Sequence, residues 1–240
     1  MSWKADVDLI PVSPRPTRPP AYEALIGNWQ PYETGSIRQM IPIFGRESGE
    51  LALAYGYPDL QSFCDDLPEA ARVLDVGSGA STLGLDVCVA RPDVRWVNAD
   101  LCYEDQKVRG ALQKDAPPNL EILAADVLDL TERTGAQRFH RVFSWYLLQH
   151  IRLAGRKPAE VSAKEILQAA EPGGSVAAGP AKRKFVKGKN PSHEAIVIKV
   201  ASSDEELDEQ AKLLVDATEQ PFLARLVQGR INQSSRILPI

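Results

Sequence analysis

Residues 72–82 read Arg-Val-Leu-Asp-Val-Gly-Ser-Gly-Ala-Ser-Thr, and this stretch decides the fold. A short apolar run typical of a strand ends in Asp75 and passes at once into Gly77-Ser78-Gly79, after which a helical pattern begins. Glycines let the backbone approach a ligand closely, and the N–H groups at a helix start attract negative charge. An acidic residue beside such a turn indicates a site for a small ligand that carries both an amine and a carboxylate.

The bulk composition places the chain among ordinary globular proteins. It has 240 residues, of which 44% are hydrophobic and 25% charged, and its formal net charge is -4. This length supports one substantial core but not two large independent domains. The negative charge argues against a surface built for nucleic acid, and it leaves room for a local basic patch.

No stretch of the sequence suggests a membrane or a secreted protein. The longest apolar runs fall short of the roughly 20 residues that a membrane helix needs, and the N-terminus lacks the apolar core of a secretory signal. The three cysteines, Cys64, Cys88 and Cys102, are odd in number and lack metal-type spacing. With only three histidines in the chain, we expect no zinc site, reduced thiols and a soluble, cytoplasmic protein.

The first 70 residues differ in character from the rest. Residues 1–20 are rich in proline, which disfavours both helix and sheet, so we expect an extended arm. Residues 21–70 are mixed and rich in aromatic side chains, and we expect a helical segment that packs near the mouth of the main domain, 71–240. Its aromatic residues are either ordinary core or a lid over the ligand.

From residue 72 onward, strand and helix patterns alternate. Strands are expected at 73–76, 94–99, 120–125, 141–146 and 175–178, and helices at 81–91, 104–115, 159–170 and 204–219. Pro172-Gly173-Gly174 should separate the third of these helices from the strand that follows. The alternation predicts an α/β fold with a doubly wound, mostly parallel sheet covered on both faces. Residues 222–228 and 236–240 are expected to pair as a C-terminal β-hairpin.

Acidic residues stand at the ends of the first three predicted strands. Asp75, Asp100 and Asp126 occupy these positions, and Ser144 to Tyr146 follow the fourth strand. In a doubly wound sheet, ligands bind beyond the carboxyl ends of the strands. An acid after the second strand can accept both hydroxyls of a ribose, and one after the third can accept from the amine of adenine. Each acid taken alone is better explained as a solvated helix cap or loop residue, but their shared placement at strand ends favours a common site.

The same residues resemble the class I methyltransferases that use S-adenosylmethionine. The matching stretches, in the order found in that family, are 73–79 (VLDVGSG), 98–101 (NADL), 125–127 (ADV), 139–151 (FHRVFSWYLLQHI) and 171–174 (EPGG). The resemblance runs from about residue 70 to 180. It implies a Rossmann-like fold, S-adenosyl-L-methionine as the cofactor and methyl transfer as the activity.

The resemblance also implies a role for each matching residue near the methionine part of the cofactor. Asp75, Gly77, Ser78 and Gly79 would contact this part, and the Ser144 carbonyl would lie near its ammonium group. The family often has a third glycine where this chain has Ser81, which makes the glycine motif less specific.

At the adenosine part, the resemblance implies four contacts. Asp100 would bind the ribose, and Leu101 would pack on the adenine. Asp126 would meet the adenine amine, with the Val127 N–H near a ring nitrogen.

The position after the fourth strand carries the candidate catalytic residue. Where the family often has two histidines, this chain has Gln149-His150. An imidazole titrates near neutral pH, so His150 is the candidate general base for a protonated O or N acceptor. Trp145 and Tyr146 are candidates for the wall of the acceptor pocket. The alternative is a structural histidine and ordinary packing of the two aromatic rings.

The glycine turn has two other possible interpretations. A dinucleotide-binding fingerprint needs a third glycine where this chain has Thr82, so a nicotinamide dehydrogenase is disfavoured. A non-catalytic partner subunit of the same fold remains an alternative. Ser144-Trp145-Tyr146-Leu147 lacks the Pro-Pro-Tyr pattern of adenine and glutamine methyltransferases, and no Pro-Cys pair supplies a nucleophile for cytosine. A small-molecule or phosphorylated acceptor at O or N is therefore expected.

The basic segment 182–189, from Lys182 to Lys189 (KRKFVKGK), is the clearest sequence feature that concerns the acceptor. It follows the fifth predicted strand and places five cations around one aromatic residue. Such a segment can hold a phosphorylated substrate or the backbone of an RNA. A solvated loop without a binding role is the alternative.

Overall fold

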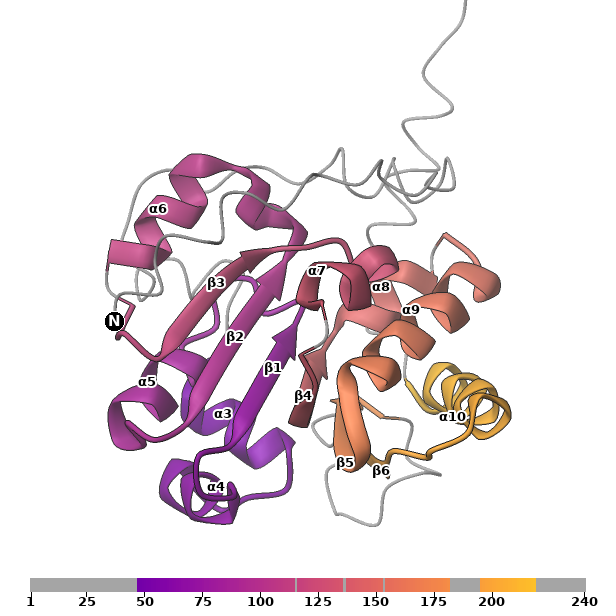
Figure 1. The fold of residues 1–240 in the computed structure, drawn as a ribbon, viewed down its shortest axis with the longest axis horizontal. Helices are drawn as coiled ribbons and strands as arrows, with labels where there is room; N and C mark the ends of the chain where they lie inside the picture. The colour runs from indigo at the N-terminus through magenta and orange to yellow at the C-terminus, as the bar shows by residue number, and fades with distance from the viewer. Residues whose placement is uncertain (1–46, 115, 136, 153, 182–194, 219–240) are drawn as a thin grey trace, which may run out of the picture.

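The computed structural model describes residues 47–114, 116–135, 137–152, 154–181 and 195–218, which Figure 1 draws as a coloured ribbon. Three predicted features lie outside these ranges: the proline-rich arm, the basic segment 182–189 and the C-terminal hairpin. Of the predicted cap segment 21–70, the structure describes residues 47–70.

The centre of the fold is a six-stranded sheet with the order β3-β2-β1-β4-β5-β6. Strands β1 to β5 run parallel, and β6 runs antiparallel to β5. The order steps from β1 to β3 in one direction and from β1 through β4 to β6 in the other, so the predicted doubly wound α/β class is confirmed. The strands are β1 (Arg72–Val76), β2 (Arg95–Asp100), β3 (Leu120–Ala124), β4 (Phe139–Trp145), β5 (Ala170–Gly179) and β6 (Ile196–Lys199).

Helices cover both faces of this sheet (Figure 1). One buried cluster joins the sheet to the side chains of α3 to α6, and a second joins its other face to α7 to α10. None of the described helices is long and apolar enough to cross a membrane. The described helices are α3 (Ser48–Ala54), α4 (Leu60–Asp66), α5 (Leu83–Ala90), α6 (Gln106–Lys114), α7 (Leu130–Thr134), α8 (Leu147–Arg152), α9 (Arg156–Ala169) and α10 (Asp204–Ala217), with short 3₁₀ turns η3 (Leu101–Glu104) and η4 (Val127–Asp129).

Strand β1 shows why both faces are buried. Its side chains alternate between the two faces, so Val73 belongs to the cluster with α5, and Leu74 and Val76 belong to the cluster with α9. All three are at most 2% exposed. By this alternation Asp75 lies on the same face as Val73, inside the protein at the end of a central strand.

An aromatic cluster fills the face that Asp75 shares. The Trp96 and Phe143 rings stack with centroids 5.8 Å apart and an interplanar angle of 6°. Phe63 from α4 lies 5.2 Å from Phe143, and Tyr55, which follows α3, lies 4.6 Å from it. Such pairs contribute about 0.5–1.5 kcal/mol each beyond the area they bury, so this cluster fixes the helices to the strands.

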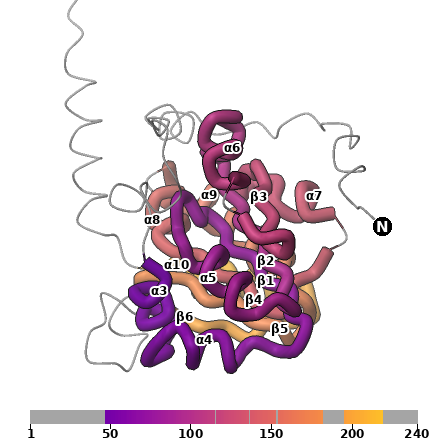
Figure 2. The backbone as a smooth tube through the Cα atoms, turned by 90° about the vertical axis from the view of Figure 1, so that its left-hand side faces the viewer, coloured from indigo at the N-terminus to yellow at the C-terminus, as the bar shows by residue number. Residues whose placement is uncertain are grey.

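The described part of the predicted cap segment forms α3 and α4, which lie side by side (Figures 1 and 2). Figure 1 and Figure 2 show α4 at the end where the strands begin, opposite α6. Arg91 holds it there by donating to the carbonyl oxygens of Cys64 and Leu67 at 2.6 and 3.2 Å. Helix α3 instead begins beside the glycine turn, since the Ser48 and Thr82 hydroxyl oxygens are 2.8 Å apart. The first residue of α3 therefore lies near the turn that follows β1.

Strand β5 begins at Ala170 rather than at Ser175 as predicted, and it runs through Pro172-Gly173-Gly174. The pairing of β4 with β5 shifts register between Phe139 and Arg141. This irregularity lets Pro172-Gly173-Gly174 remain within the strand instead of forming a loop. A Cβ at Gly174 would lie 2.9 Å from the Glu171 carbonyl oxygen, so the irregularity needs glycine there. The expected break between helix and strand was therefore wrong, because these glycines serve a bulge.

Strand β6 is absent from the predicted elements, although its Ile-Val-Ile run favours a strand. Ile198 is 8% exposed and packs in the core, whereas Val197 is 59% exposed. A run of only four residues shows too little alternation to be separated from a loop by sequence alone.

The predicted start of the last helix is confirmed at α10. Ser203 accepts a hydrogen bond from the Glu206 N–H at 3.4 Å and donates to the Glu206 carboxylate at 2.7 Å. This reciprocal pair is a capping box. The helix lies against α9, to which Lys164 and Asp208 add an ion pair of 2.6 Å.

Candidate functional site

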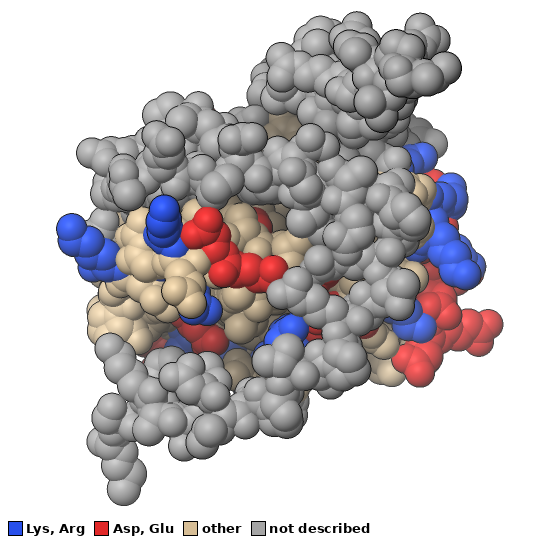
Figure 3. Space-filling view, turned by 90° about the horizontal axis from the view of Figure 1, so that it is seen from above, with Lys and Arg blue, Asp and Glu red and all other residues tan. Residues whose placement is uncertain are grey.

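The three acids predicted to form a site lie on neighbouring strand ends. Asp75 is paired in register with Asn98 of β2, and Asp100 is the last residue of that same strand. The Asp100 carbonyl oxygen accepts from the Ala125 N–H at 3.3 Å, which places Asp126 directly beyond β3. Figure 3 views this end of the molecule, where acidic and basic side chains both lie among uncharged ones on the described surface. The structure therefore brings Asp75, Asp100 and Asp126 to one rim of the sheet.

The glycine turn after β1 has a backbone shape that demands glycine. Gly77 and Gly79 have φ angles of +74° and +53°, in the left-handed region. A Cβ at Gly77 would lie 3.0 Å from the Leu147 side chain at the start of α8. The Gly77 N–H donates to the Ala99 carbonyl oxygen at 2.8 Å, so the turn bends across the end of β2. The predicted close approach of backbone to this rim is thus possible only without a side chain.

Asp100, at the predicted ribose position, also stabilises this turn by accepting backbone hydrogen bonds. Its Oδ2 accepts from the Gly79 N–H and its Oδ1 from the Cys102 N–H, both at 2.9 Å. Burial raises the pKa of the Asp100 carboxyl, and these two hydrogen bonds oppose the rise. Each carboxylate oxygen has a second lone pair, so both can still accept from a ligand hydroxyl.

Tyr103 is a residue of this rim that the sequence reasoning missed. It lies in η3 and is 0% exposed. Its hydroxyl donates to the Gly79 carbonyl oxygen and is 2.8 Å from the Ser78 hydroxyl. Burial raises the pKa of Tyr103 well above its ordinary value, so the hydroxyl stays protonated. The available signal was its position, three residues after Asp100, where one turn brings it back over the strand end.

Asp126 and its neighbour occupy the predicted adenine position. Asp126 is 4% exposed, and its Oδ1 accepts from the Leu128 N–H at 3.0 Å, which caps η4. Val127 begins that turn and is buried, and Leu101 begins η3 at the neighbouring strand end. The predicted contacts of these residues with an adenosine remain predictions, and their positions beyond β2 and β3 agree with them.

Asp75 is the most unusual group of the site. Asp75 is only 3% exposed, and none of the described residues donates a hydrogen bond to its carboxylate. Burial, and to a lesser extent the negative charge of Asp100, raise the pKa of Asp75 to about 7. A buried carboxylate without a partner is costly, so this position favours a ligand that supplies positive charge or donors.

The end of β4 contributes a strained backbone and an unpaired hydroxyl. Ser144 is 2% exposed, and its Oγ has no hydrogen-bond partner among the described residues. Tyr146 has a φ of +65°, and its N–H donates to the Gly179 carbonyl oxygen at 2.8 Å. A non-glycine residue in this conformation costs free energy and persists where the surroundings impose it. The chain therefore turns sharply at the predicted acceptor side of the rim.

His150 lies on α8, directly after this turn. Its side chain is exposed, and no described hydrogen bond or ion pair joins it to the three acids. Neighbouring protein atoms lower the pKa of the His150 imidazole, and its exposure limits the effect because water still reaches the ring. The preceding Gln149 is buried and donates to the Pro180 carbonyl oxygen at 3.1 Å. The structure thus places His150 at the correct end of β4 and leaves its catalytic role a prediction.

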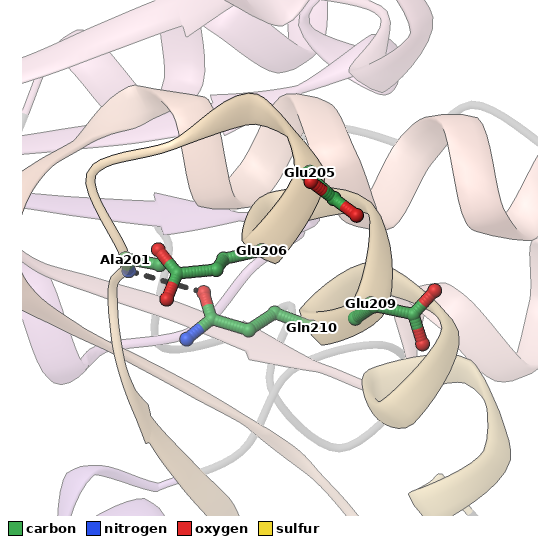
Figure 4. A pocket seen from close by; sticks show the side chains of 5 residues that line it. All are labelled: Ala201, Glu205, Glu206, Glu209 and Gln210. Carbon is green, nitrogen blue, oxygen red and sulfur yellow. Dashed lines mark hydrogen bonds between the residues drawn. The ribbon is translucent and has the colours of Figure 1, made fainter.

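Two open hollows in the described surface lie elsewhere. One, shown in Figure 4, is lined by Ala201 and four side chains of α10, and Gln210 accepts there from the Ala201 N–H at 3.2 Å. Two of its glutamates, Glu205 and Glu206, stand in the first turn of α10, where the helix dipole favours negative charge, and Glu209 pairs with Lys212. The other lies beside the first residues of β5. Neither gathers the polar groups that meet at the rim.

Comparisons with known proteins find similar solved structures but no similar sequence family. No protein-family profile matches the chain, and no curated relative matches it by sequence. TrmN from Thermus thermophilus is similar in structure, with 23% identity and a TM-score of 0.38 over 50% of this chain and 35% of TrmN. A TehB-like SAM-dependent methyltransferase from Corynebacterium glutamicum has 15% identity and a TM-score of 0.43, over 74% of this chain and 77% of that one.

The N-methyltransferase NodS from Bradyrhizobium japonicum, solved with S-adenosyl-l-homocysteine, is also similar. Its identity is 14% and its TM-score 0.37, over 45% of this chain and 51% of NodS. This chain therefore spans about a third of TrmN and half of NodS. Likenesses at these identities and TM-scores assign no activity, and the residues of the rim carry the functional proposal.

Proposed function

We propose that this chain is an S-adenosyl-L-methionine-dependent methyltransferase that acts on an O or N atom of a small or phosphorylated acceptor. The observation that carries this proposal is the buried carboxylate of Asp75, which lacks a described partner and stands beside a glycine turn. Asp100 and Asp126 follow at the next two strand ends. Three acids on adjacent strands suit a long ligand that carries positive charge at one end.

The residues present fit the proposed cofactor. Its ammonium group would offset the charge of Asp75, and its ribose hydroxyls would donate to the free lone pairs of Asp100. Asp126 would accept from the adenine amine, and Leu101 and Val127 would flank the ring. Each assignment matches the position of that residue along the rim from β1 to β3.

The bound cofactor would supply a methyl group on a sulfonium, which leaves readily in an in-line displacement. The chain mainly has to align the acceptor with that group and exclude water. Alignment alone can lower the barrier by about 7–11 kcal/mol in favourable cases. The strained turn at Tyr146 and the neighbouring Trp145 would form the wall on the acceptor side. His150 would accept a proton where the acceptor carries one.

Binding measurements test the proposal directly. In calorimetric titration of the full chain, S-adenosylhomocysteine should bind saturably at one site, and NAD should not bind. The double variant Asp75→Asn/Asp100→Ala should lose this binding. If it still binds S-adenosylhomocysteine, the placement of the site is wrong. Binding of NAD alone would contradict the proposed class.

Activity assays address the acceptor. Release of S-adenosylhomocysteine should depend on a small amine, hydroxyl or phosphorylated compound added to the full chain. Turnover with RNA alone, lost at high salt, would favour an RNA acceptor held through 182–189. Cofactor binding without turnover on any acceptor class would favour a non-catalytic partner subunit.

A further inference from the structure

Three buried polar atoms near the buried carboxylate of Asp75 lack hydrogen-bond partners among the described residues. They are the Nδ2 of Asn98, the hydroxyl of Tyr55 and the indole Nε1 of Trp145, and with the carboxylate they make four polar groups. Buried polar groups in folded proteins are almost always paired, so a cluster of unpaired ones calls for an explanation. A missing ligand explains all four together.

The strand register places two of these groups side by side. Asp75 lies between Asn98 of β2 and Phe143 of β4, which are its partners on the two neighbouring strands. Trp145 comes two residues after Phe143, so it lies on the same face and nearer the carboxyl end. Asp75, Asn98 and Trp145 therefore border one region of this face.

Tyr55 reaches the same region from the N-terminal side of the fold. Its ring centroid lies 4.6 Å from that of Phe143 and 5.7 Å from that of Trp145, edge-on to the indole. Burial, and to a lesser extent the charge of Asp75, raise the pKa of the Tyr55 hydroxyl well above its ordinary value. The phenol is therefore protonated at neutral pH and available as a donor.

The bonding capacity of the four groups is unequal. Asn98 Oδ1 already accepts from the Trp96 Nε1–H at 2.8 Å, so its remaining amide atom can only donate. Trp145 Nε1–H is also a pure donor, and Asp75 when ionised is a pure acceptor. The region thus offers donors around one carboxylate. A ligand that carries both an ammonium and a carboxylate group on adjacent atoms matches this set.

We infer that Tyr55 and Trp145 bind the carboxylate of the ligand whose ammonium group pairs with Asp75. The residue that follows α3, Tyr55, then supplies a contact to the ligand. The inference rests on the proposed function, because the methionine part of S-adenosylmethionine is this amino-acid end. Selectivity for the amino-acid end of the cofactor then depends on Tyr55, which precedes β1.

The test compares two tyrosines that each lose one hydroxyl. Tyr55→Phe removes the unpaired phenolic oxygen, whereas Tyr57→Phe removes one that donates to Asp66 at 2.6 Å beside α4. Calorimetry of the full chain measures affinity for S-adenosylhomocysteine and for 5′-methylthioadenosine, which lacks the amino-acid end. We expect Tyr55→Phe to weaken S-adenosylhomocysteine binding about tenfold or more and to leave 5′-methylthioadenosine binding unchanged. Tyr57→Phe should alter neither affinity.

A second measurement separates binding from folding. The Tyr55 hydroxyl has no partner in the ligand-free protein, so Tyr55→Phe should leave the unliganded melting temperature unchanged or raise it. A lower melting temperature, or equal loss of both affinities, would mean that Tyr55 is structural and would overturn the inference. Trp145→Phe should show the same ligand selectivity.

The failure of this inference differs from failure of the proposed function. If the unaltered chain binds neither ligand, the methyltransferase proposal fails. If it binds S-adenosylhomocysteine and Tyr55→Phe binds it equally well, the proposed function stands and the role of Tyr55 is wrong.

Discussion

The carboxylate of Asp100 accepts a hydrogen bond from the backbone N–H of Gly79 at 2.9 Å, so the end of β2 holds the turn that follows β1. The two residues are 21 positions apart in the chain. One carboxylate therefore shapes the glycine turn and also faces the predicted ribose position. Changes at Asp100 should affect both stability and ligand binding.

Asp100→Ala should weaken binding of S-adenosylhomocysteine by about ten- to a hundredfold and lower the free energy of unfolding by about 1–3 kcal/mol. The ribose loses a charged acceptor, and the Gly79 and Cys102 N–H groups lose theirs. Titration calorimetry and urea unfolding measure the two effects. Asp65→Ala, on the exposed side of α4, serves as the control and should change neither. Unchanged affinity in Asp100→Ala would remove the ribose assignment.

Asp75 should make the stability of the ligand-free protein fall as pH rises. Its folded pKa is about 7, against 3.8 ordinarily, so between these values the unfolded chain releases a proton that the folded protein keeps. The stability is full below about pH 4, falls as pH rises and levels off above about pH 7. From pH 5 to pH 8 the loss should be on the order of 3 kcal/mol.

The variant Asp75→Asn isolates this effect, because it removes the titrating group. The free energy of unfolding of Asp75→Asn, measured relative to that of the unaltered chain, should therefore be higher at pH 8 than at pH 5. Urea unfolding at both pH values measures it. An equal difference at the two values would mean that Asp75 titrates normally. Bound S-adenosylhomocysteine should reduce the pH effect, because its ammonium group stabilises the charged carboxylate.

Two glycines in helices should respond oppositely to alanine. At Gly84 in α5, a Cβ would lie 2.5 Å from Trp96 Nε1 and 2.9 Å from Asn98 Oδ1. At Gly110 in α6, it would meet nothing within 4 Å. Gly84→Ala should destabilise the protein by about 1–3 kcal/mol through overpacking, and Gly110→Ala should stabilise it by up to about 1 kcal/mol. Thermal and urea unfolding compare the pair, and a neutral Gly84→Ala would mean that α5 is not held closely against β2.

His150→Ala should slow turnover by about a hundredfold if the acceptor must lose a proton, and it should leave S-adenosylhomocysteine affinity unchanged. Because desolvation lowers the pKa of His150, the rate of the unaltered chain should rise with pH through a midpoint below about 6.5 and then stay level. His140→Ala at the start of β4, where the ring accepts from the Arg72 N–H at 3.0 Å, is the control. Equal loss of turnover and affinity in His150→Ala would indicate a structural histidine.

The central strands and the three acids could be predicted because their signals are local. Val73 to Val76 is a short, mostly apolar run that ends at a glycine turn, and Asp100 and Asp126 each follow a short, mostly apolar run as well. In parallel strands such ends meet at one edge, so their convergence follows from the alternation. The start of β5 was missed because a proline and two glycines suit both a loop and a bulge, and only pairing with β4 distinguishes the two.

Other parts of the site depend on contacts between distant residues. Tyr103 bonds to Ser78 and Gly79 across more than 20 positions, and Tyr55, which follows α3, meets Trp145. Neither tyrosine stands in a local pattern that separates it from an ordinary core aromatic. Their roles follow from which hydroxyls the fold pairs and which it leaves unpaired.

The amino-acid sequence alone determined the fold class and the rim at which a ligand would lie, because periodic burial and glycine turns are encoded over a few neighbouring residues. The tertiary structure decided which polar groups at that rim are already satisfied. Asp100 is bonded to the turn, whereas Asp75, Tyr55 and Trp145 lack described partners. Hydrogen bonding depends on distances between side chains from separate elements, and these exist only after the chain has folded.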